Sequence, residues 1–213
     1  GTHSHIPNLR QPPAARKMSL SRVFGEITET LSNKSFLWLF MASLFGFMAN
    51  GVAATLNYFI NGFYWEFTTS QTALLTWSVA ISAAMAFVLA PLVSKTIGKK
   101  RGAVIIGILA FTIAPMPVLL RLAGLMPANG SETLFNLILG VTIIDVALII
   151  TFQILSSSMI ADIVEDSEMK TGRRSEGIFF AGILFMRKLA RGSGLFLASL
   201  ILAAAELSRD MQP

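Results

Sequence analysis

The sequence predicts an all-α membrane protein whose helices cross the bilayer five times. Three observations indicate this fold class. Hydrophobic residues make up 54% of the 213 residues. Charged residues make up only 14%, whereas a soluble domain is about a quarter charged. Nearly uncharged apolar runs of about 20 residues recur along the chain, and a helix of that length spans a bilayer. Because these runs are continuous rather than alternating, they predict helices and not barrel strands.

Each predicted span is an apolar run bounded by polar or charged residues. The five spans are residues 36–60, 72–93, 103–120, 134–160 and 177–205. The third is the most apolar and contains Pro115 and Pro117. These residues predict a kink, because proline lacks the amide hydrogen that a helix needs. Pro91 is expected to loosen the end of the second span for the same reason.

The first 34 residues are predicted to be a polar linker, and residues 35–213 the transmembrane bundle. Within the linker, apolar residues recur at helical spacing: Leu20, Val23, Phe24, Ile27 and Leu31. This pattern predicts an amphipathic helix on the inner leaflet or the loops, and a plain solvated connector is the alternative. The chain opens at Gly1, without an initiator methionine, so we expect it to be a piece of a longer polypeptide.

The distribution of lysine and arginine predicts the orientation. The linker and the loops that follow the second and fourth spans carry twelve of these cations, whereas the opposite side carries only Arg121 and Arg209. By the positive-inside rule the twelve face the cytoplasm. Tyr64, Trp65 and Phe67 are then expected to form an aromatic belt at the outer boundary. We expect a multi-pass protein of a bacterial cytoplasmic (inner) membrane.

Three cations lie inside the fifth span. At 100° per residue Arg187, Lys188 and Arg191 share one face, and the opposite arc is apolar. A cation in the bilayer centre costs at least a few kcal/mol, so this face is expected to line a wet cavity or the protein interior. Asp145 lies at a similar depth in the fourth span and is expected to pair with Lys188 or Arg191. Alternatively, Asp145 neutralises a neighbour without a role in transport, or the two arginines snorkel to the interface.

Polar side chains in the first span supply further candidates for a solute pathway. Asn50, Asn57 and Asn61 lie on one stripe at spacings of seven and four. Amides suit a polyhydroxylated solute, although they also serve as ordinary hydrogen-bonding contacts between helices. In the fifth span Gly192 and Gly194 are expected to allow close helix packing or a bend.

Two cytoplasmic loops resemble a known superfamily. The stretch PLVSKTIGKKRG, residues 91–102, resembles the signature loop of the major facilitator superfamily. Lys95 stands where that loop usually has an acidic residue, so the charge-relay role of that residue does not carry over. Residues 159–194 resemble the glycoside–pentoside–hexuronide:cation symporters, which are melibiose-permease relatives within this superfamily. The residues that match are Asp162, Glu165, Asp166, Lys170, Thr171, Gly172, Arg173, Glu176, Gly177 and Lys188.

The resemblance covers about residues 20–205 and implies a partial C-terminal half, with a linker followed by helices seven to eleven. The first six helices and the last helix of the same polypeptide are then expected partners. The resemblance also implies a cytoplasmic gate, whose charges pair across the two halves and separate when the transporter opens. Its residues are Asp162, Glu165, Asp166, Lys170, Arg173 and Glu176. A solvated charged turn without a switching role is the alternative.

The expected function is cation-coupled symport of a sugar or related small solute by alternating access. The resembled family also has relatives that carry amphipathic or anionic, lipid-like solutes, and a non-transporting membrane scaffold is the rival from another class. The coupling cation, Na⁺ or H⁺, is expected to bind mainly in the N-terminal half. The sequence has no phosphate-cradling glycine loop, metal-ligand spacing or nucleophile–base pattern. We therefore expect no enzyme activity, cofactor, metal site or nucleic-acid partner, and we expect the bilayer to surround the chain.

Overall fold

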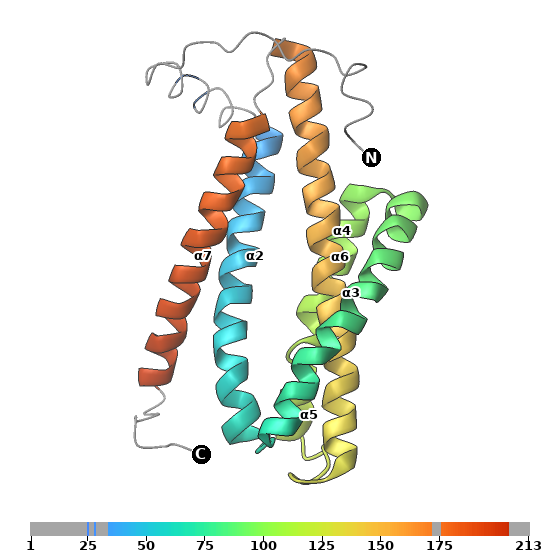
Figure 1. Ribbon diagram of the computed structural model, residues 1–213, viewed down its shortest axis with the longest axis vertical. Coiled ribbons are helices and arrows are strands. Elements are labelled where there is room, and N and C mark those ends of the chain that lie inside the picture. The colour runs from blue at the N-terminus through green and yellow to red at the C-terminus, as the bar shows by residue number, and fades with distance from the viewer. Residues whose placement is uncertain (1–24, 26–27, 29–33, 172–175, 205–213) are drawn as a thin grey trace, which may run out of the picture.

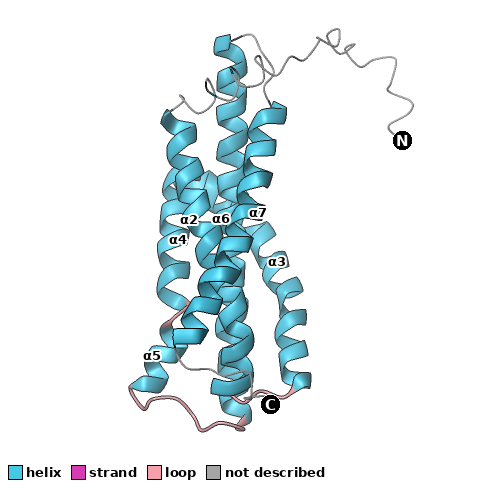
Figure 2. Ribbon diagram, turned by 90° about the vertical axis from the view of Figure 1, so that its left-hand side faces the viewer, coloured by secondary structure: helices cyan, strands magenta, loops and turns pink. Residues whose placement is uncertain are grey.

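The computed structural model describes residues 34–171 and 176–204, together with Gly25 and Thr28. These described residues form helices joined by short loops, without strands (Figure 2). The helices are α2 (Lys34–Phe59), η2 (Ile60–Tyr64, a π-helix), α3 (Thr69–Ile97), α4 (Lys99–Ile113), α5 (Met116–Leu122), α6 (Glu132–Thr171) and α7 (Glu176–Ala204). The amphipathic helix predicted over residues 20–31 lies outside the described residues, apart from Gly25 and Thr28.

Several of the described helices are long enough to cross a membrane. Three of them are long and apolar enough to cross a bilayer: Thr69–Ile97, Lys99–Leu122 and Glu132–Asp166. Helices α2 and α7 contain 26 and 29 residues. At the standard helical rise they are about 39 and 44 Å long, which exceeds the roughly 30 Å of the hydrocarbon core. The predicted fold class, an all-α membrane protein, is confirmed.

The third predicted span is one crossing made of two helices. Helix α4 ends at Ile113 and α5 begins at Met116. Neither Pro115 nor Pro117 has an amide hydrogen to donate to the preceding turn, so the helical ladder is interrupted at this point. The kink predicted from these two prolines is therefore observed as a break.

The bundle consists of two groups of helices (Figure 1). Helix α7 packs along α2, and α3 and α4 both pack along α6. Contacts between the two groups, from α6 to α2 and α7, are sparse. Helices α2, α6 and α7 therefore lie next to one another without closing tightly, and this arrangement positions the site described below.

The pairing of α2 with α7 depends on close contact between their backbones. A Cβ atom added to Gly194 would lie 2.9 Å from the carbonyl carbon and from the Cα of Gly51, and 3.0 Å from the amide nitrogen of Val52. Real Cβ atoms do not approach backbone so closely, so only glycine fits at this crossing. The prediction of close packing is confirmed for Gly194. Gly192 is exposed, and a Cβ there would meet nothing within 4 Å.

Buried hydroxyl and glycine contacts hold α3 and α4 against α6. The hydroxyl of Ser82 on α3 donates to the carbonyl of Ile143 on α6 at 3.0 Å, and it also lies 3.1 Å from the carbonyl of Ser78. On α4, a Cβ at Gly107 would lie 3.5 Å from the ring of Phe152. The polar groups of α3 in this contact therefore serve helix packing.

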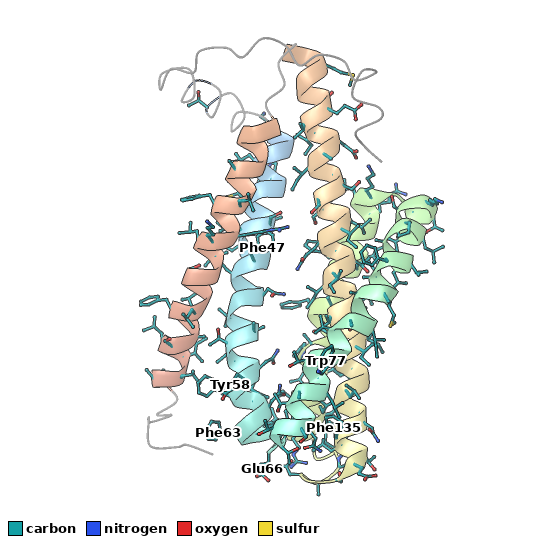
Figure 3. All side chains as sticks on the ribbon, viewed as in Figure 1. Phe47, Tyr58, Phe63, Glu66, Trp77 and Phe135 are labelled. Atoms are coloured by element: carbon teal, nitrogen blue, oxygen red, sulfur yellow. The ribbon has the colours of Figure 1, made fainter. Side chains whose placement is uncertain are left out.

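Trp65 is part of the core at one end of the bundle and not part of an interfacial belt. It is only 3% exposed and packs in a cluster with Leu75, Leu134, Phe135 and Ile138. The expectation that Trp65 faces the membrane boundary was wrong. The reason is that the π-helix η2 turns its indole inward, onto α3 and α6. We call this end of the bundle, where Phe135 lies in Figure 3, the Trp65 end.

Hydrogen bonds close the loops at the Trp65 end. The guanidinium of Arg121 on α5 donates to the side-chain oxygen of Asn129 at 2.7 Å. The amide nitrogen of Asn129 donates in turn to the backbone carbonyl of Tyr64 at 3.1 Å. Thr68 caps α3 in a reciprocal capping box with Gln71. The first two contacts link η2, α5 and the loop before α6, and the capping box fixes the start of α3.

Helix α6 is longer than the sequence pattern predicts. The predicted span ended at residue 160, but the helix continues to Thr171. The extension contains neither glycine nor proline, so nothing in it interrupts the helical ladder. Asp162, Glu165 and Asp166 therefore lie on the last turns of a helix and not on a loop.

Candidate functional site

A cavity of about 470 Å³ lies between α2, α6 and α7. The lining side chains of α2 are separated by three or four residues, so they share one helical face. Gln153 faces the cavity from α6, and Arg187 and Leu195 face it from α7. The lining residues that the structure describes are Phe47, Asn50, Gly51, Ala54, Thr55, Gln153, Arg187 and Leu195.

Arg187 supplies the positive charge of this cavity. Its guanidinium carbon lies 5.2 Å from the centroid of the Phe47 ring, in cation–π geometry. Its Nε is buried and has no hydrogen-bond partner. Arg187 is 11 residues from the start of α7, or about 16 Å along the helix at the standard rise. Phe47 likewise lies on α2 far from Phe135 at the Trp65 end (Figure 3). The charge is therefore deep in the bundle.

Two amides accompany this guanidinium. In the described residues, neither Asn50 nor Gln153 takes part in a hydrogen bond, although both line the cavity. The remaining polar side chain, Thr55, donates to the carbonyl of Gly51 at 3.0 Å. Gln153 and Arg187 are half-buried, whereas Asn50 is exposed, and polar groups that leave water are normally paired. A cavity that brings together three groups with unused hydrogen-bonding capacity is therefore suited to a polar solute.

The other predicted pathway residues are distributed along the bundle. Lys188 is exposed and does not line the cavity. Asn57 is also exposed, and Asn61 lies half-buried in η2, where its carbonyl accepts the amide hydrogen of Phe67 at 2.9 Å. The side chain of Arg191 lies outside the described residues. Asn50 and Arg187 are thus the two predicted residues that the structure brings together.

Asp145 is half-buried on α6, and its Oδ1 is buried without a hydrogen-bond partner. The ion pairs of the described residues do not join Asp145 to Lys188. The pairing with Lys188 is therefore not observed, whereas the pairing with Arg191 stays a prediction, because that side chain lies outside the described residues. Asp145 and Arg187 are two charged side chains within the spans, each with a buried polar atom that has no partner.

The charges predicted to form a gate are found at the opposite end from Trp65. The ammonium of Lys99, at the start of α4, lies 2.7 and 2.6 Å from the two carboxylate oxygens of Asp162 on α6. This ion pair joins α4 to α6 within this chain. Glu165 is exposed. Arg173 and the side chains of Lys170 and Glu176 lie outside the described residues.

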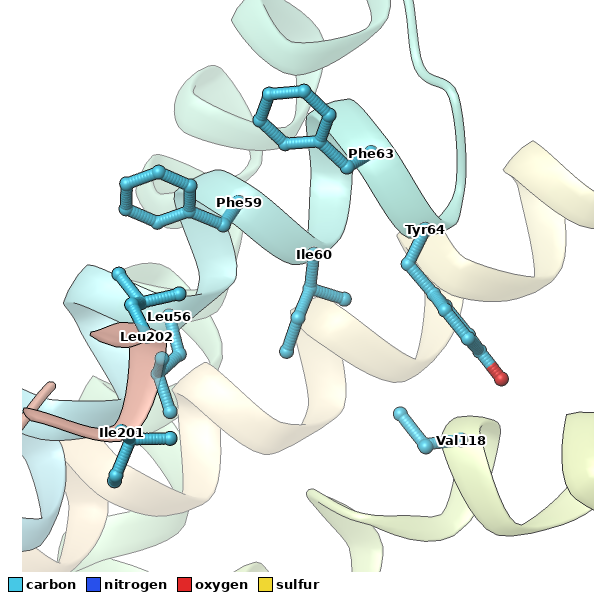
Figure 4. A pocket seen from close by; sticks show the side chains of 8 residues that line it. All are labelled: Leu56, Phe59, Ile60, Phe63, Tyr64, Val118, Ile201 and Leu202. Atoms are coloured by element: carbon cyan, nitrogen blue, oxygen red, sulfur yellow. The ribbon is translucent and has the colours of Figure 1, made fainter. Parts of the chain in front are cut away.

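A second cavity, of about 360 Å³, has a lining of apolar and aromatic residues (Figure 4). It lies near the Trp65 end, where η2, α5 and α7 approach one another. Its lining residues are Leu56, Phe59, Ile60, Phe63, Tyr64, Val118, Ile201 and Leu202. Because none of these described lining residues has a charged or amide side chain, they offer little to a hydroxylated solute.

Sequence reasoning did not identify Phe47 as a candidate. Its position three residues before Asn50 was the available signal, because such residues share a helix face. The sequence does not distinguish this phenylalanine from the other phenylalanines among the 16 of the chain, however. Its role becomes visible only when Arg187 is seen above its ring.

Comparison with known proteins agrees with this architecture. Residues 1–213 match the family described as MFS/sugar transport protein. A segment of 48 residues is 44% identical to an uncharacterized symporter of Synechocystis sp., and this segment is 22% of the chain and 9% of the relative. The relative is therefore more than twice as long as this chain. No solved structure matches. The protein is an integral membrane protein, and the chain belongs to the MFS/sugar transport protein family.

Proposed function

We propose that this chain is the C-terminal part of a secondary active transporter that moves a sugar or related small solute by alternating access. Uptake is coupled to Na⁺ or H⁺, and an N-terminal six-helix half supplies most of the cation site. The cavity that brings Arg187, Asn50 and Gln153 together deep between three helices is the observation that carries this proposal. Family membership supports it, as does the relative named as a symporter.

In this proposal the end of the bundle where α4 begins, at Lys99, faces the cytoplasm of a bacterial cell, and the Trp65 end faces outward. The excess of lysine and arginine at the Lys99 end supports this orientation. The ion pair of Lys99 with Asp162 holds α4 against α6 at the inner surface. Each exposed pair of this kind is worth about 0–1 kcal/mol, so a cytoplasmic gate built from such pairs opens repeatedly without a large barrier.

The test is uptake by the full-length protein in proteoliposomes, with an imposed Na⁺ or H⁺ gradient and a panel of labelled sugars and sugar acids. Substitution of Asn50 or Gln153 by alanine removes one hydrogen bond to the solute. This should lower the specificity constant of transport about 5- to 10-fold. The matched control is Lys100→Gln, which changes an exposed cation far from the cavity and should leave uptake unchanged.

Two results would contradict the proposal. Uptake that does not respond to either gradient would exclude cation coupling. Unchanged uptake in both Asn50→Ala and Gln153→Ala would move the solute pathway away from this cavity. The rival function, a membrane scaffold, predicts that the full-length protein transports no member of the panel.

A second candidate function is supported by Arg187. A guanidinium without a partner suits an anionic or amphipathic solute better than a neutral sugar, because burying an unpaired charge is costly. The amides and the cation in one cavity also allow a solute that is both hydroxylated and anionic.

A further inference from the structure

We propose that Arg187 is the anchor for a carboxylate group on the transported solute, with Phe47 holding the guanidinium and the amides of Asn50 and Gln153 completing an anion subsite. This inference rests on the proposed transport function, because a charged cavity is a solute site only if solute passes through it. It goes further by assigning the chemical class of the group that is bound.

Arg187 has hydrogen-bond donors that no other described side chain uses. A guanidinium has five N–H donors and no acceptor, and it keeps its charge in proteins. In this structure its Nε is buried without a partner, and Arg187 forms none of the ion pairs of the described residues. The guanidinium carbon lies over the Phe47 ring, 5.2 Å from its centroid. The parallel N–H donors of a guanidinium fit the two oxygens of a carboxylate.

The other described residues that line the cavity also favour an anion. Asn50 and Gln153 carry amide donors that have no partner in the described part of the chain. Thr55 already donates to a backbone carbonyl and is less available. None of the lining residues that the structure describes is acidic. Hydrogen-bond donors are therefore not opposed by a carboxylate within the described lining, and this favours an anion.

The charge of the described lining limits the charge of the bound group. Among the residues that the structure describes, one guanidinium and neutral amides line the cavity, and they offset a single negative charge. A phosphate monoester carries close to two charges, and its second charge would be left uncompensated in a poorly solvated cavity. The lining thus favours a monoanion, and a carboxylate matches the geometry. A phosphodiester of a lipid headgroup is also a monoanion, and the experiment below separates it from a solute.

The test measures the charge preference of the cavity directly. The 213 residues contain no cysteine, so Ala54→Cys introduces a thiol on the cavity wall. Any cysteines elsewhere in the full-length protein are replaced by serine. The rates of modification by an anionic sulfonatoethyl and a cationic trimethylammonioethyl methanethiosulfonate are compared, and their ratio is referred to that of free cysteine. A neutral methyl reagent measures accessibility alone.

We expect the anionic-to-cationic rate ratio at Ala54→Cys to exceed that of free cysteine by about tenfold, and to fall with increasing salt. Adding Arg187→Gln should abolish this excess, whereas Arg187→Lys should keep most of it because the charge remains. Lys100→Gln is the matched control, since it removes an exposed cation outside the cavity. Size-exclusion profiles and the rate with the neutral reagent show whether each variant folds.

Several outcomes would overturn the inference. The first is an anionic-to-cationic rate ratio at Ala54→Cys that equals the ratio of free cysteine while Arg187 is still present. The second is a rate ratio that Arg187→Gln does not change. The third is a thiol that none of the three reagents modifies. An anion preference that is present in detergent but absent in liposomes containing phosphatidylglycerol would mean that a lipid phosphate occupies Arg187. That result would also reject a solute carboxylate.

Failure of the inference and failure of the proposed function are distinguishable. The labelling experiment needs no transported substrate, and the uptake panel needs no cysteine. Uptake of neutral sugars without an anion preference at Ala54→Cys would reject only the carboxylate subsite. A clear anion preference in a protein that transports no member of the panel would reject the transport function.

Discussion

Replacement of Gly194 by alanine should loosen the contact between α2 and α7. The new Cβ would lie 2.9 Å from backbone atoms of Gly51, whereas non-bonded carbon atoms prefer about 3.5–4.0 Å. Because the opposing atoms are backbone, neither side chain can move aside, and the two helices must separate by about 0.5–1 Å. A gap of this size removes about a quarter to a half of the dispersion energy of the contacts it opens.

The expected cost is about 1–3 kcal/mol, which is typical of overpacking, reduced by up to about 1 kcal/mol because alanine favours the helix over glycine. The control is Gly192→Ala, two residues away in the same helix, where a Cβ meets nothing within 4 Å. Thermal unfolding of the full-length protein in detergent should show a lower midpoint for Gly194→Ala and an equal or higher midpoint for Gly192→Ala. Equal effects of the two substitutions would refute the close backbone contact.

Three further predictions concern the packing and the ion pair. Trp65→Ala should destabilise the protein by about 3–5 kcal/mol, whereas Trp77→Ala, at a side chain that is 77% exposed, should change the unfolding midpoint little. A double-mutant cycle of Lys99→Gln and Asp162→Asn should give a coupling energy below about 1 kcal/mol that decreases with salt, because the side chains are 36% and 55% exposed; a larger, salt-insensitive coupling would contradict this. Ser82→Ala should cost about 0.6 kcal/mol, the usual worth of an interhelical hydrogen bond in a membrane, and no measurable loss would show that the bond is dispensable.

The sequence predicts the helices well because each span is decided locally. Apolar runs between charged residues predict the helices, and two prolines predict the break between α4 and α5. The sequence-based predictions fail where the burial of a side chain depends on residues of other helices. Trp65 has the composition and position of an interfacial anchor, but its burial depends on Leu75 and Phe135, which are distant in the sequence. The length of α6 was underestimated because a hydropathy criterion stops at Asp162, although charged residues continue a helix readily once it protrudes from the membrane.

The candidate site shows the same division between local and long-range information. Periodicity correctly places Arg187 and Lys188 in the middle of a span, but the two residues are 100° apart around the helix, and the sequence cannot say which direction faces α2. The structure shows that Arg187 faces the ring of Phe47 and the cavity, while Lys188 is exposed elsewhere.

The same reasoning applies to Asp145. Its depth made pairing with a cation of α7 plausible, yet α6 and α7 make too few contacts for that depth alone to bring the charges together. A buried carboxylate oxygen and a buried guanidinium nitrogen, each without a partner, are both costly in a membrane span. Because the carboxylate and the guanidinium do not pair with each other, neither charge stabilises the fold. Under the proposed transport function, a bound solute supplies the partner that Arg187 lacks, and the cavity beside Arg187 has room for it.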